Sequence, residues 1–352
     1  MTTPADKLML ELLRGEAQLP DPADPLWEGC ASSLAREALA GVGLGLLKKR
    51  GMLEGLAPPA RRLLEKELNK VRTEQVILFH HFGALADRLA RAGVPTILHK
   101  GGALAPLIYD RTEDRPMVDI DVIVRPEDWT RVHEMLLASK YRLPPGEGTD
   151  FWRENYYNIA VASPEDPPAS FDLHWSITQE GRYNISTEDL FQRAVPFTWD
   201  GRRLLRMGNE DLLLSLFLHL AYHYFEARLL WLYDMKRLMQ AWPIDWNVLR
   251  ERADAWGLRT VVALNLSFLA KVFPEAIPPE ALGAARSGPV RSLLLAPLRS
   301  PETLHLFRAD RRRPVHFVVG LLAIDRPSHA MRFAGDKLAR SWRWMGRAPR
   351  TR

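Results

Sequence analysis

The feature that most restricts the fold of this chain is a short apolar run, residues 117–124, that carries two aspartates. Its β-branched residues predict a strand, and their alternate positions place the side chains of Asp119 and Asp121 on one face of it. Burying two carboxylates without a partner is costly, so such a pair needs a cation. The sequence predicts either a shared divalent metal ion, for which Mg²⁺ suits the oxygen ligands, or ion pairs with Arg111 or Arg115.

A second strand candidate, residues 170–177, offers a third carboxylate. Asp172, His174 and Ser176 alternate with apolar residues and therefore share one face. An ordinary polar strand face would explain this pattern equally well. If this strand lies beside residues 117–124, the carboxylate of Asp172 converges with the other two acids, an arrangement suited to displacement at phosphorus.

A lysine and two glycines precede the aspartates. Lys100, Gly101 and Gly102 lie between a predicted strand at residues 94–99 and a predicted helix at residues 103–109. Glycine lets the backbone approach a ligand closely, the start of a helix offers N–H groups to an anion, and lysine adds a positive charge. Alone the segment is a turn, but ahead of the two aspartates it is a candidate phosphate cradle.

Polar residues also interrupt the apolar helical stretch that follows the strands. His219 and His223 are four residues apart, so on a helix they share a face. They could line the cleft beside the acids, or they could pack into the helical core with their ring nitrogens bonded. Asp234 is expected to be a buried partner for an arginine or a histidine.

The spacing of apolar residues predicts an α+β fold, with a small mixed β-sheet core flanked by helices and a mostly α-helical C-terminal region. Expected segments are a helical N-terminal segment (1–72), the α/β core (73–200), a helical domain (201–305) and a basic helical tail (306–352). Helices are predicted at residues 73–92, 126–136, 210–240, 246–256 and 260–273, and strands at residues 94–99, 117–124, 156–162 and 170–177.

Composition and missing motifs exclude several classes of protein. The single cysteine, Cys30, excludes an internal disulfide framework, and 47% hydrophobic residues exclude a mainly disordered chain. The sequence contains no Walker A loop, G-x-G-x-x-G loop or G-x-S-x-G elbow. Because it also has no apolar run long enough to span a bilayer and no secretion signal, a cytoplasmic location is expected.

The net charge of +5 is distributed unevenly along the chain. Residues 306–352 hold twelve Lys and Arg against three Asp and Glu, a balance of +9, whereas the preceding residues balance at −4. The tail arginines are interleaved with Trp342 and Trp344. This pattern fits contact with RNA or with an anionic membrane surface, and it also fits a solvated helix face.

Taken together, the motifs resemble the DNA polymerase β-like nucleotidyltransferase superfamily, and within it a poorly characterised bacterial nucleotidyltransferase family with a K-G…R…D-I-D pattern. The resemblance covers residues 76–240. It rests on Lys100-Gly101-Gly102, Arg115, Asp119-Ile120-Asp121, Asp172-Leu173-His174-Trp175, His219, His223 and residues 229–234.

The resemblance implies a role for each matched residue. Asp119 and Asp121 would bind Mg²⁺, with Mn²⁺ as a substitute, together with the triphosphate. Asp172 would be the third metal-binding acid and would aid deprotonation of an acceptor hydroxyl. The remaining matches would contact the nucleotide or the acceptor: Lys100, Gly101, Gly102, Arg115 and His174 the nucleotide, and His219 and His223 the base or the acceptor.

The implied activity is Mg²⁺-dependent transfer of a nucleoside monophosphate from an NTP to a hydroxyl group, with release of pyrophosphate. The acceptor could be a small molecule, a protein or an RNA. Two alternatives are a metal-dependent D-x-D glycosyltransferase that uses a sugar nucleotide, and a non-catalytic nucleotide-binding regulatory module. Loss of one acid would favour the regulatory module, but all three acids are present.

Overall fold

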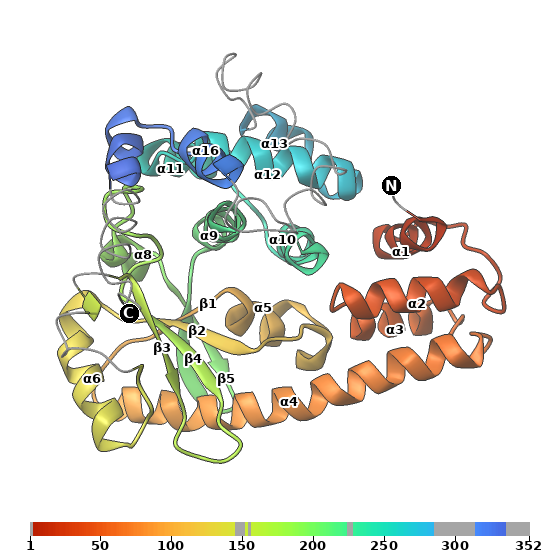
Figure 1. The fold of residues 1–352 in the computed structure, drawn as a ribbon, viewed down its shortest axis with the longest axis horizontal. Helices are drawn as coiled ribbons and strands as arrows, with labels where there is room; N and C mark the ends of the chain where they lie inside the picture. The colour runs from red at the N-terminus through yellow and green to blue at the C-terminus, as the bar shows by residue number, and fades with distance from the viewer. Residues whose placement is uncertain (1–2, 145–151, 154–155, 224–227, 285–313, 336–352) are drawn as a thin grey trace, which may run out of the picture.

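The structure is a computed structural model that describes residues 3–144, 152–153, 156–223, 228–284 and 314–335. Within these residues six strands form one sheet in the order β3-β4-β2-β1-β6-β5 (Figure 1). The pairs β2–β4 and β1–β6 are parallel and the others are antiparallel, so the sheet is mixed, as predicted for the α+β class. The strands are β1 (Ile97–His99), β2 (Asp119–Ile123), β3 (Asn158–Ala162), β4 (Ser170–His174), β5 (Val195–Trp199) and β6 (Arg202–Arg206).

The register of the sheet brings the predicted acids onto neighbouring strands. Asp121 of β2 lies opposite Asp172 of β4, and Asp119 lies opposite Ser170. On the other side of β2, Asp121 lies opposite His99 of β1. Because side chains alternate along a strand, the three aspartates project from one face of the sheet. The condition set for Asp172, that its strand lies beside residues 117–124, is therefore met.

The face of the sheet away from the acids is covered by α4 (Pro58–Arg91) and α6 (Trp129–Ala138) (Figure 1). Phe82 and Leu85 of α4 share a buried core with Val122 and Leu173 of the strands. The pair Pro58–Pro59 forms the first turn of α4. Proline is tolerated there because the first N–H groups of a helix have no intrahelical partner.

The first half of α4 extends beyond the sheet and carries the N-terminal helices (Figure 1). Helices α2 (Leu26–Arg36) and α3 (Ala40–Lys49) pack against α4, and α1 (Pro4–Arg14) packs against α2. Buried Leu12, Trp27 and Leu34 belong to this packing. The predicted helical N-terminal segment is therefore joined to the sheet by one continuous helix.

The face that carries the acids is covered by α5 (Lys100–Ile108), α9 (Asn209–Tyr222) and α10 (Leu229–Ala241). Leu104 and Ile108 of α5 share a core with Ile97 and Ile123 of the sheet. The predicted helix over residues 210–240 is thus two helices, and residues 224–227 between them lie outside the described part. The other helices are α8 (Thr187–Gln192), α11 (Trp246–Trp256), α12 (Arg259–Val272), α13 (Pro279–Ala284) and α16 (Pro314–Leu322).

The hairpin of β5 and β6 was not predicted from the sequence. It turns at Asp200 and Gly201, whose φ angles of 48° and 73° are left-handed. An Asp-Gly pair with these angles is typical of a two-residue hairpin turn. The predicted boundary between the core and the helical domain falls in this turn.

The basic tail predicted over residues 306–352 is described only over residues 314–335, so Trp342, Trp344 and most of the tail arginines lie outside the described part. Among the described helices, none combines the length and the hydropathy needed to cross a bilayer.

Candidate active site

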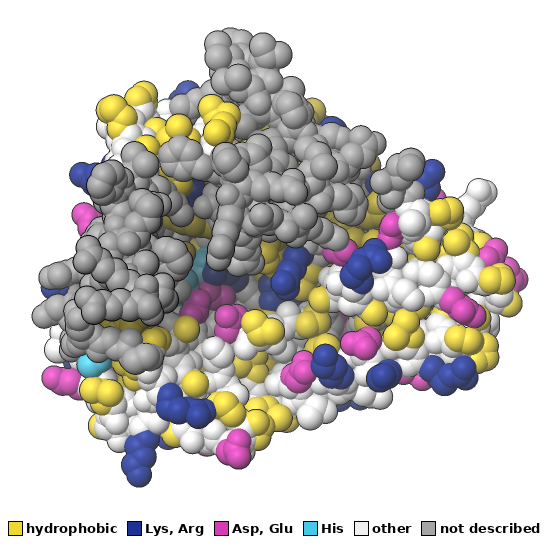
Figure 2. Space-filling model, in the orientation of Figure 1, with side chains coloured by type: hydrophobic (Ala, Val, Ile, Leu, Met, Phe, Trp, Pro, Cys, Tyr) yellow, Lys and Arg dark blue, Asp and Glu magenta, His cyan; other side chains and the backbone are white. Residues whose placement is uncertain are grey.

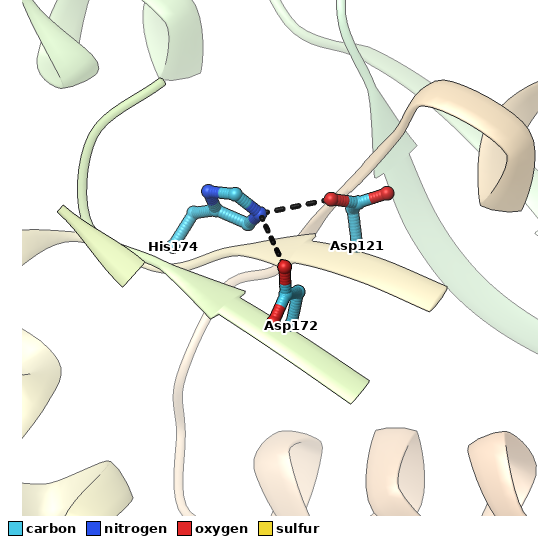
Figure 3. Close-up of side chains that lie close together, drawn as sticks. All are labelled: Asp121, Asp172 and His174. Atoms are coloured by element: carbon cyan, nitrogen blue, oxygen red, sulfur yellow. Dashed lines mark hydrogen bonds and ion pairs between the residues drawn. The ribbon is translucent and has the colours of Figure 1, made fainter. Parts of the chain in front are cut away.

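The centre of the candidate site is a group of three side chains on β2 and β4 (Figure 3). Potential ligand atoms of Asp121, Asp172 and His174 lie within 4.8 Å of one another. The Nε2 atom of His174 is 2.9 Å from Oδ1 of Asp121 and 4.0 Å from Oδ2 of Asp172. Asn158 of β3 donates a hydrogen bond of 3.1 Å from Nδ2 to the same Oδ2 atom. The sheet register therefore produces a compact group of two carboxylates and one imidazole.

Lys100 supplies a positive charge directly to this group. Its Nζ atom is 2.6 Å from Oδ1 of Asp121, the oxygen that also faces His174. Burial alone would raise the pKa of Asp121, but the charge of Lys100 and the hydrogen bond from His174 outweigh it, so the pKa lies well below its ordinary value. Lys100 reaches this position from a backbone with φ 46°, which is unusual for a residue other than glycine.

The carboxylate of Asp119 has no comparable compensation. Burial, followed by repulsion from Asp121 and Asp172, raises its pKa to about 6, against the opposing charges of Lys100 and Arg115. At neutral pH the three carboxylates therefore exceed the positive charge beside them. A site of this kind attracts an additional cation.

Neither arginine near the strand takes the role that the ion-pair alternative assigned to it. The guanidinium of Arg111 pairs with Asp114. Arg115 donates from Nη2 to Oδ2 of Asp234 over 2.8 Å and from Nε to Oδ1 over 3.3 Å. The expectation that Asp234 is a buried partner for an arginine is confirmed. Of the two aspartates of β2, Asp121 is paired with Lys100 and His174 instead.

The glycine pair lies in the first turn of α5 and packs closely against β2 and the segment that leads into it. A Cβ atom at position 101 would overlap the guanidinium of Arg115, and one at position 102 would lie 2.9 Å from Cγ2 of Ile120. Packing alone therefore requires glycine at both positions. Since α5 begins at Lys100, the backbone N–H groups of Gly101 and Gly102 belong to its first turn, where they have no partner within the helix.

The site opens into a cavity of about 870 Å³, large enough for a nucleotide and part of a second substrate. Figure 2 shows acidic and basic side chains side by side in the hollow of this face. The cavity is lined by nine of the ten predicted site residues, all except Gly102: Lys100, Gly101, Arg115, Asp119, Asp121, Asp172, His174, His219 and His223.

The wall opposite the acids is aromatic. The ring centroids of His219 and His223 are 4.6 Å apart, and that of Trp231 on α10 is 4.5 Å from His219 and 4.8 Å from His223. Burial, together with the nearby charge of Lys100, holds the pKa of His219 well below its ordinary value, so this ring is neutral at pH 7. The two histidines line the cavity, as the first of the two alternatives requires, and their rings pack against each other and against Trp231.

Some cavity residues were missed by the sequence reasoning. His99 and Asn158 flank the acids from β1 and β3, and Arg36 and Glu37 reach the cavity from the end of α2. His99 directly precedes the lysine and glycines in sequence, a proximity that could have identified it. No local signal could have identified Arg36 or Glu37, because they belong to a different part of the chain.

Comparison with known proteins adds three findings. The family model of the uncharacterised nucleotidyltransferases matches residues 24–274. Among solved structures, the chain is similar to the antibiotic-resistance factor ANT(2'')-Ia, with 15% identity, a TM-score of 0.27, and coverage of 67% of this chain and 90% of that one. No curated protein sequence matches. Because the family match includes the whole candidate site and most of the chain, the protein belongs to the family of uncharacterised nucleotidyltransferases.

Proposed function

We propose that the protein is a Mg²⁺-dependent enzyme that transfers a nucleoside monophosphate from an NTP to a hydroxyl group of an acceptor and releases pyrophosphate. The observation that carries the proposal is the placement of Asp121 opposite Asp172, with Asp119 on the same face. Three carboxylates on one face of a sheet that borders a cavity are suited to a divalent cation and a triphosphate. The family to which the chain belongs supports nucleotidyl transfer, and it favours this activity over glycosyl transfer.

The residues present fit a divalent cation. Asp119, Asp121 and Asp172 supply oxygen donors, and the raised pKa of Asp119 reflects negative charge that the neighbouring side chains leave uncompensated. A bound Mg²⁺ or Mn²⁺ would neutralise charge on the triphosphate and make the α-phosphorus more electrophilic. Asp119 and Asp121 would hold it from β2, and Asp172 would hold it from β4.

The remaining residues would position the substrates. Lys100 and the N–H groups of Gly101 and Gly102 would bind the β- and γ-phosphates at the start of α5. The wall of His219, His223 and Trp231 would bind the base or the acceptor through its ring faces. His174 would contact the nucleotide. Arg115 would act mainly by holding the glycine segment in place, since its guanidinium is bonded to Asp234.

In the transfer itself, the acceptor oxygen would form a bond to the α-phosphorus as the bond from that phosphorus to the bridging β-phosphate oxygen breaks. The proton of the hydroxyl would pass to Asp172, whose side chain is partly exposed and held by Asn158. Pyrophosphate would leave with the electron pair of the broken bond. Most of the rate enhancement would come from positioning and charge neutralisation.

The composition of the basic tail, residues 306–352, guides the choice of the acceptor to test. Because the tail is rich in arginine and contains tryptophan, an RNA hydroxyl is the first acceptor to test, ahead of a small molecule, a protein or a membrane-associated acceptor. The proposed use of an NTP is consistent with a cytoplasmic location.

The proposal is tested first by binding and then by transfer. Thermal unfolding would be followed with ATP, GTP, CTP and UTP, with and without Mg²⁺, since a ligand at 100 times its Kd stabilises the native state by about 2.7 kcal/mol. We expect one NTP to raise the Tm only when Mg²⁺ is present. That NTP, labelled at the α-phosphate, would then be offered to RNA, protein and small-molecule fractions.

Matched variants make the test specific. The double variant Asp119→Asn/Asp121→Asn should lose both the metal-dependent shift and the transfer of label. Glu134→Gln, an exposed substitution on α6, should retain both. Transfer that persists in the double variant, or a shift produced only by sugar nucleotides, would contradict the proposal.

A further inference from the structure

The position of His174 distinguishes this site from one made of carboxylates alone. Its side chain is almost fully buried, and Nε2 points between the carboxylates of Asp121 and Asp172 (Figure 3). Asp119, the third predicted acid, is not a member of this close group. The side chains nearest to a common centre are therefore two aspartates and one histidine.

The environment of Nδ1, the other ring nitrogen of His174, allows Nε2 to bind a cation. Nδ1 of His174 is buried and has no hydrogen-bond partner among the described residues. In the metal-free protein Nε2–H donates to Oδ1 of Asp121, but no contact at Nδ1 keeps the proton off that atom. A bound cation can therefore displace the proton from Nε2, and the tautomer with the proton on Nδ1 then offers the Nε2 lone pair to the metal.

We infer that His174 is itself a metal ligand, so that Asp121, Asp172 and His174 form a mixed oxygen and nitrogen site that binds Mn²⁺ or Co²⁺ in preference to Mg²⁺. This inference rests on the proposed function, because it concerns the cation that supports nucleotidyl transfer. It changes the donor set from three carboxylates to two carboxylates and an imidazole, with Asp119 left to contact the nucleotide-bound cation or the triphosphate.

The distances suit such a site. Ligand atoms about 2.1 Å from a metal lie about 3–3.5 Å from each other at the angles usual for these ions. The separations of 2.9 Å and 4.0 Å from Nε2 to the two carboxylate oxygens bracket this range. Only small side-chain movements are needed, together with displacement of the Lys100 ammonium from Oδ1 of Asp121.

The preference of the site for Mn²⁺ or Co²⁺ over Mg²⁺ follows from the donor atoms. Mg²⁺ binds oxygen ligands and is a poor partner for imidazole, whereas divalent transition metals accept imidazole nitrogen with an affinity that increases from Mn²⁺ to Co²⁺. An imidazole in the donor set should therefore raise the affinity for Mn²⁺ and Co²⁺ relative to Mg²⁺. The useful quantity is the ratio of the two Kd values, because Mn²⁺ also binds somewhat more tightly to all-oxygen sites.

The direct test uses the full-length protein without nucleotide. Isothermal titration with MnCl₂, CoCl₂ and MgCl₂ gives the three Kd values, and pulsed electron paramagnetic resonance of the Mn²⁺ complex detects a nitrogen nucleus bonded to the metal. We expect Mn²⁺ to bind at least about tenfold more tightly than Mg²⁺, and we expect a ¹⁴N coupling of a directly coordinated imidazole. Absence of that coupling in the wild-type complex would overturn the inference without any substitution.

Two substitutions separate the role of the nitrogen from that of the side chain as a whole. His174→Asp provides an oxygen donor, and we expect the Mn²⁺ to Mg²⁺ preference to fall at least about fivefold while Mg²⁺ binding persists. His174→Gln should weaken Mn²⁺ binding by about tenfold or more and remove the ¹⁴N coupling. The control His133→Gln removes a histidine of α6, on the other face of the sheet, and should leave both metal affinities and the coupling unchanged.

The outcomes distinguish this inference from the proposed function. A ratio of affinities unchanged in His174→Asp, with NTP transfer still dependent on a divalent metal, would overturn the histidine ligand and leave the proposed function intact. Transfer that needs no divalent metal would overturn both. Thermal unfolding of each variant shows that any lost binding comes from folded protein.

Discussion

Asp121 and Asp234 are both nearly inaccessible to solvent and both meet a cationic side chain, but their surroundings differ. Both oxygens of Asp234 are bonded, by the guanidinium of Arg115 and by the hydroxyl of Tyr109, which lies 2.7 Å from Oδ1. Asp121 receives Lys100 and His174 on one oxygen, Oδ1, and borders a cavity. The carboxylate of Asp234 therefore lies in a closed hydrogen-bond network, whereas that of Asp121 lies in an open network beside the cavity.

The difference shows how a structural acid and a functional acid can be told apart. The donors around Asp234 satisfy both of its carboxylate oxygens. Its ion pair with Arg115 connects α10 to the segment that leads into β2. Around Asp121 the neighbouring groups include two further carboxylates, one of which has a pKa raised to about 6. Shortage of positive charge beside a cavity is the feature that supports the proposed cation site at Asp121.

The largest effect should come from Asp121→Asn. We expect nucleotidyl transfer to fall by about 10³- to 10⁴-fold, as for the loss of one member of a catalytic group, because the substitution removes a charged ligand at the cation site. Transfer would be measured with the NTP identified by thermal unfolding. The free energy of unfolding should change less than in Asp234→Ala, since the side chain of Lys100 is 18% exposed and can regain water.

The next largest effect, on stability, should come from Asp234→Ala. Removing this carboxylate leaves the buried guanidinium of Arg115 without its partner, which typically costs about 3–5 kcal/mol. Urea unfolding measures the loss, and titration with Mn²⁺ should show that the folded fraction still binds the metal. Arg115→Met/Asp234→Leu removes both charges and should cost less than the single substitution. Equal losses would contradict the view that the pair is a closed structural unit.

Much of the open site could be predicted because strand periodicity is local. Alternation placed Asp119 and Asp121 on one face, and placed Asp172 and His174 together on another strand. The pairing of Asp121 with Asp172 depends on the order of strands in the sheet, which local patterns do not encode. It could be stated only as a condition, and the structure meets that condition.

The closed network was harder to predict because its partners are far apart in the chain. The partner of Asp234 could be predicted by chemical type, as an arginine or a histidine, but Arg115 lies 119 residues away and was assigned to the triphosphate instead. The contact of Lys100 with Asp121 likewise depends on a left-handed backbone at Lys100 that no residue preference predicts. The hairpin turn at Asp200 and Gly201, by contrast, had a local signal that was overlooked.

A smaller effect tests the charge imbalance through pH. The pKa of Asp119 rises from 3.8 to about 6 on folding, so the folded protein binds this proton more tightly than the unfolded chain does. Stability relative to Asp119→Asn should therefore decrease as the pH rises from about 4 to about 6, and then remain constant above pH 6. We expect the wild type to be less stable than the variant by about 2 kcal/mol at pH 8, after allowance for solvent screening.

Urea unfolding of both proteins without divalent metal, at several pH values between 4 and 8, measures this difference. Addition of Mg²⁺ or Mn²⁺ at pH 8 should reduce it, because a bound cation compensates the carboxylates in the wild type. A difference that is independent of pH would show that Asp119 ionises normally, and the contrast with Asp234 would then rest on geometry alone.

The smallest effect concerns Lys100, the cation that occupies part of the open site. Its ammonium and a metal ion compete for Oδ1 of Asp121, so Lys100→Met should tighten Mn²⁺ binding to the nucleotide-free protein by about fivefold, or about 1 kcal/mol. The same substitution should weaken binding of the NTP with metal present, because the variant lacks the ammonium that, in the wild type, the metal would displace toward the phosphates. Titrations with Mn²⁺ alone and with NTP and Mn²⁺ measure the two effects. If Lys100→Met weakened both Mn²⁺ binding and NTP binding, Lys100 would be a structural partner of Asp121, as Arg115 is of Asp234. Asp121 and Asp234 would then not differ in the role of their cationic partners.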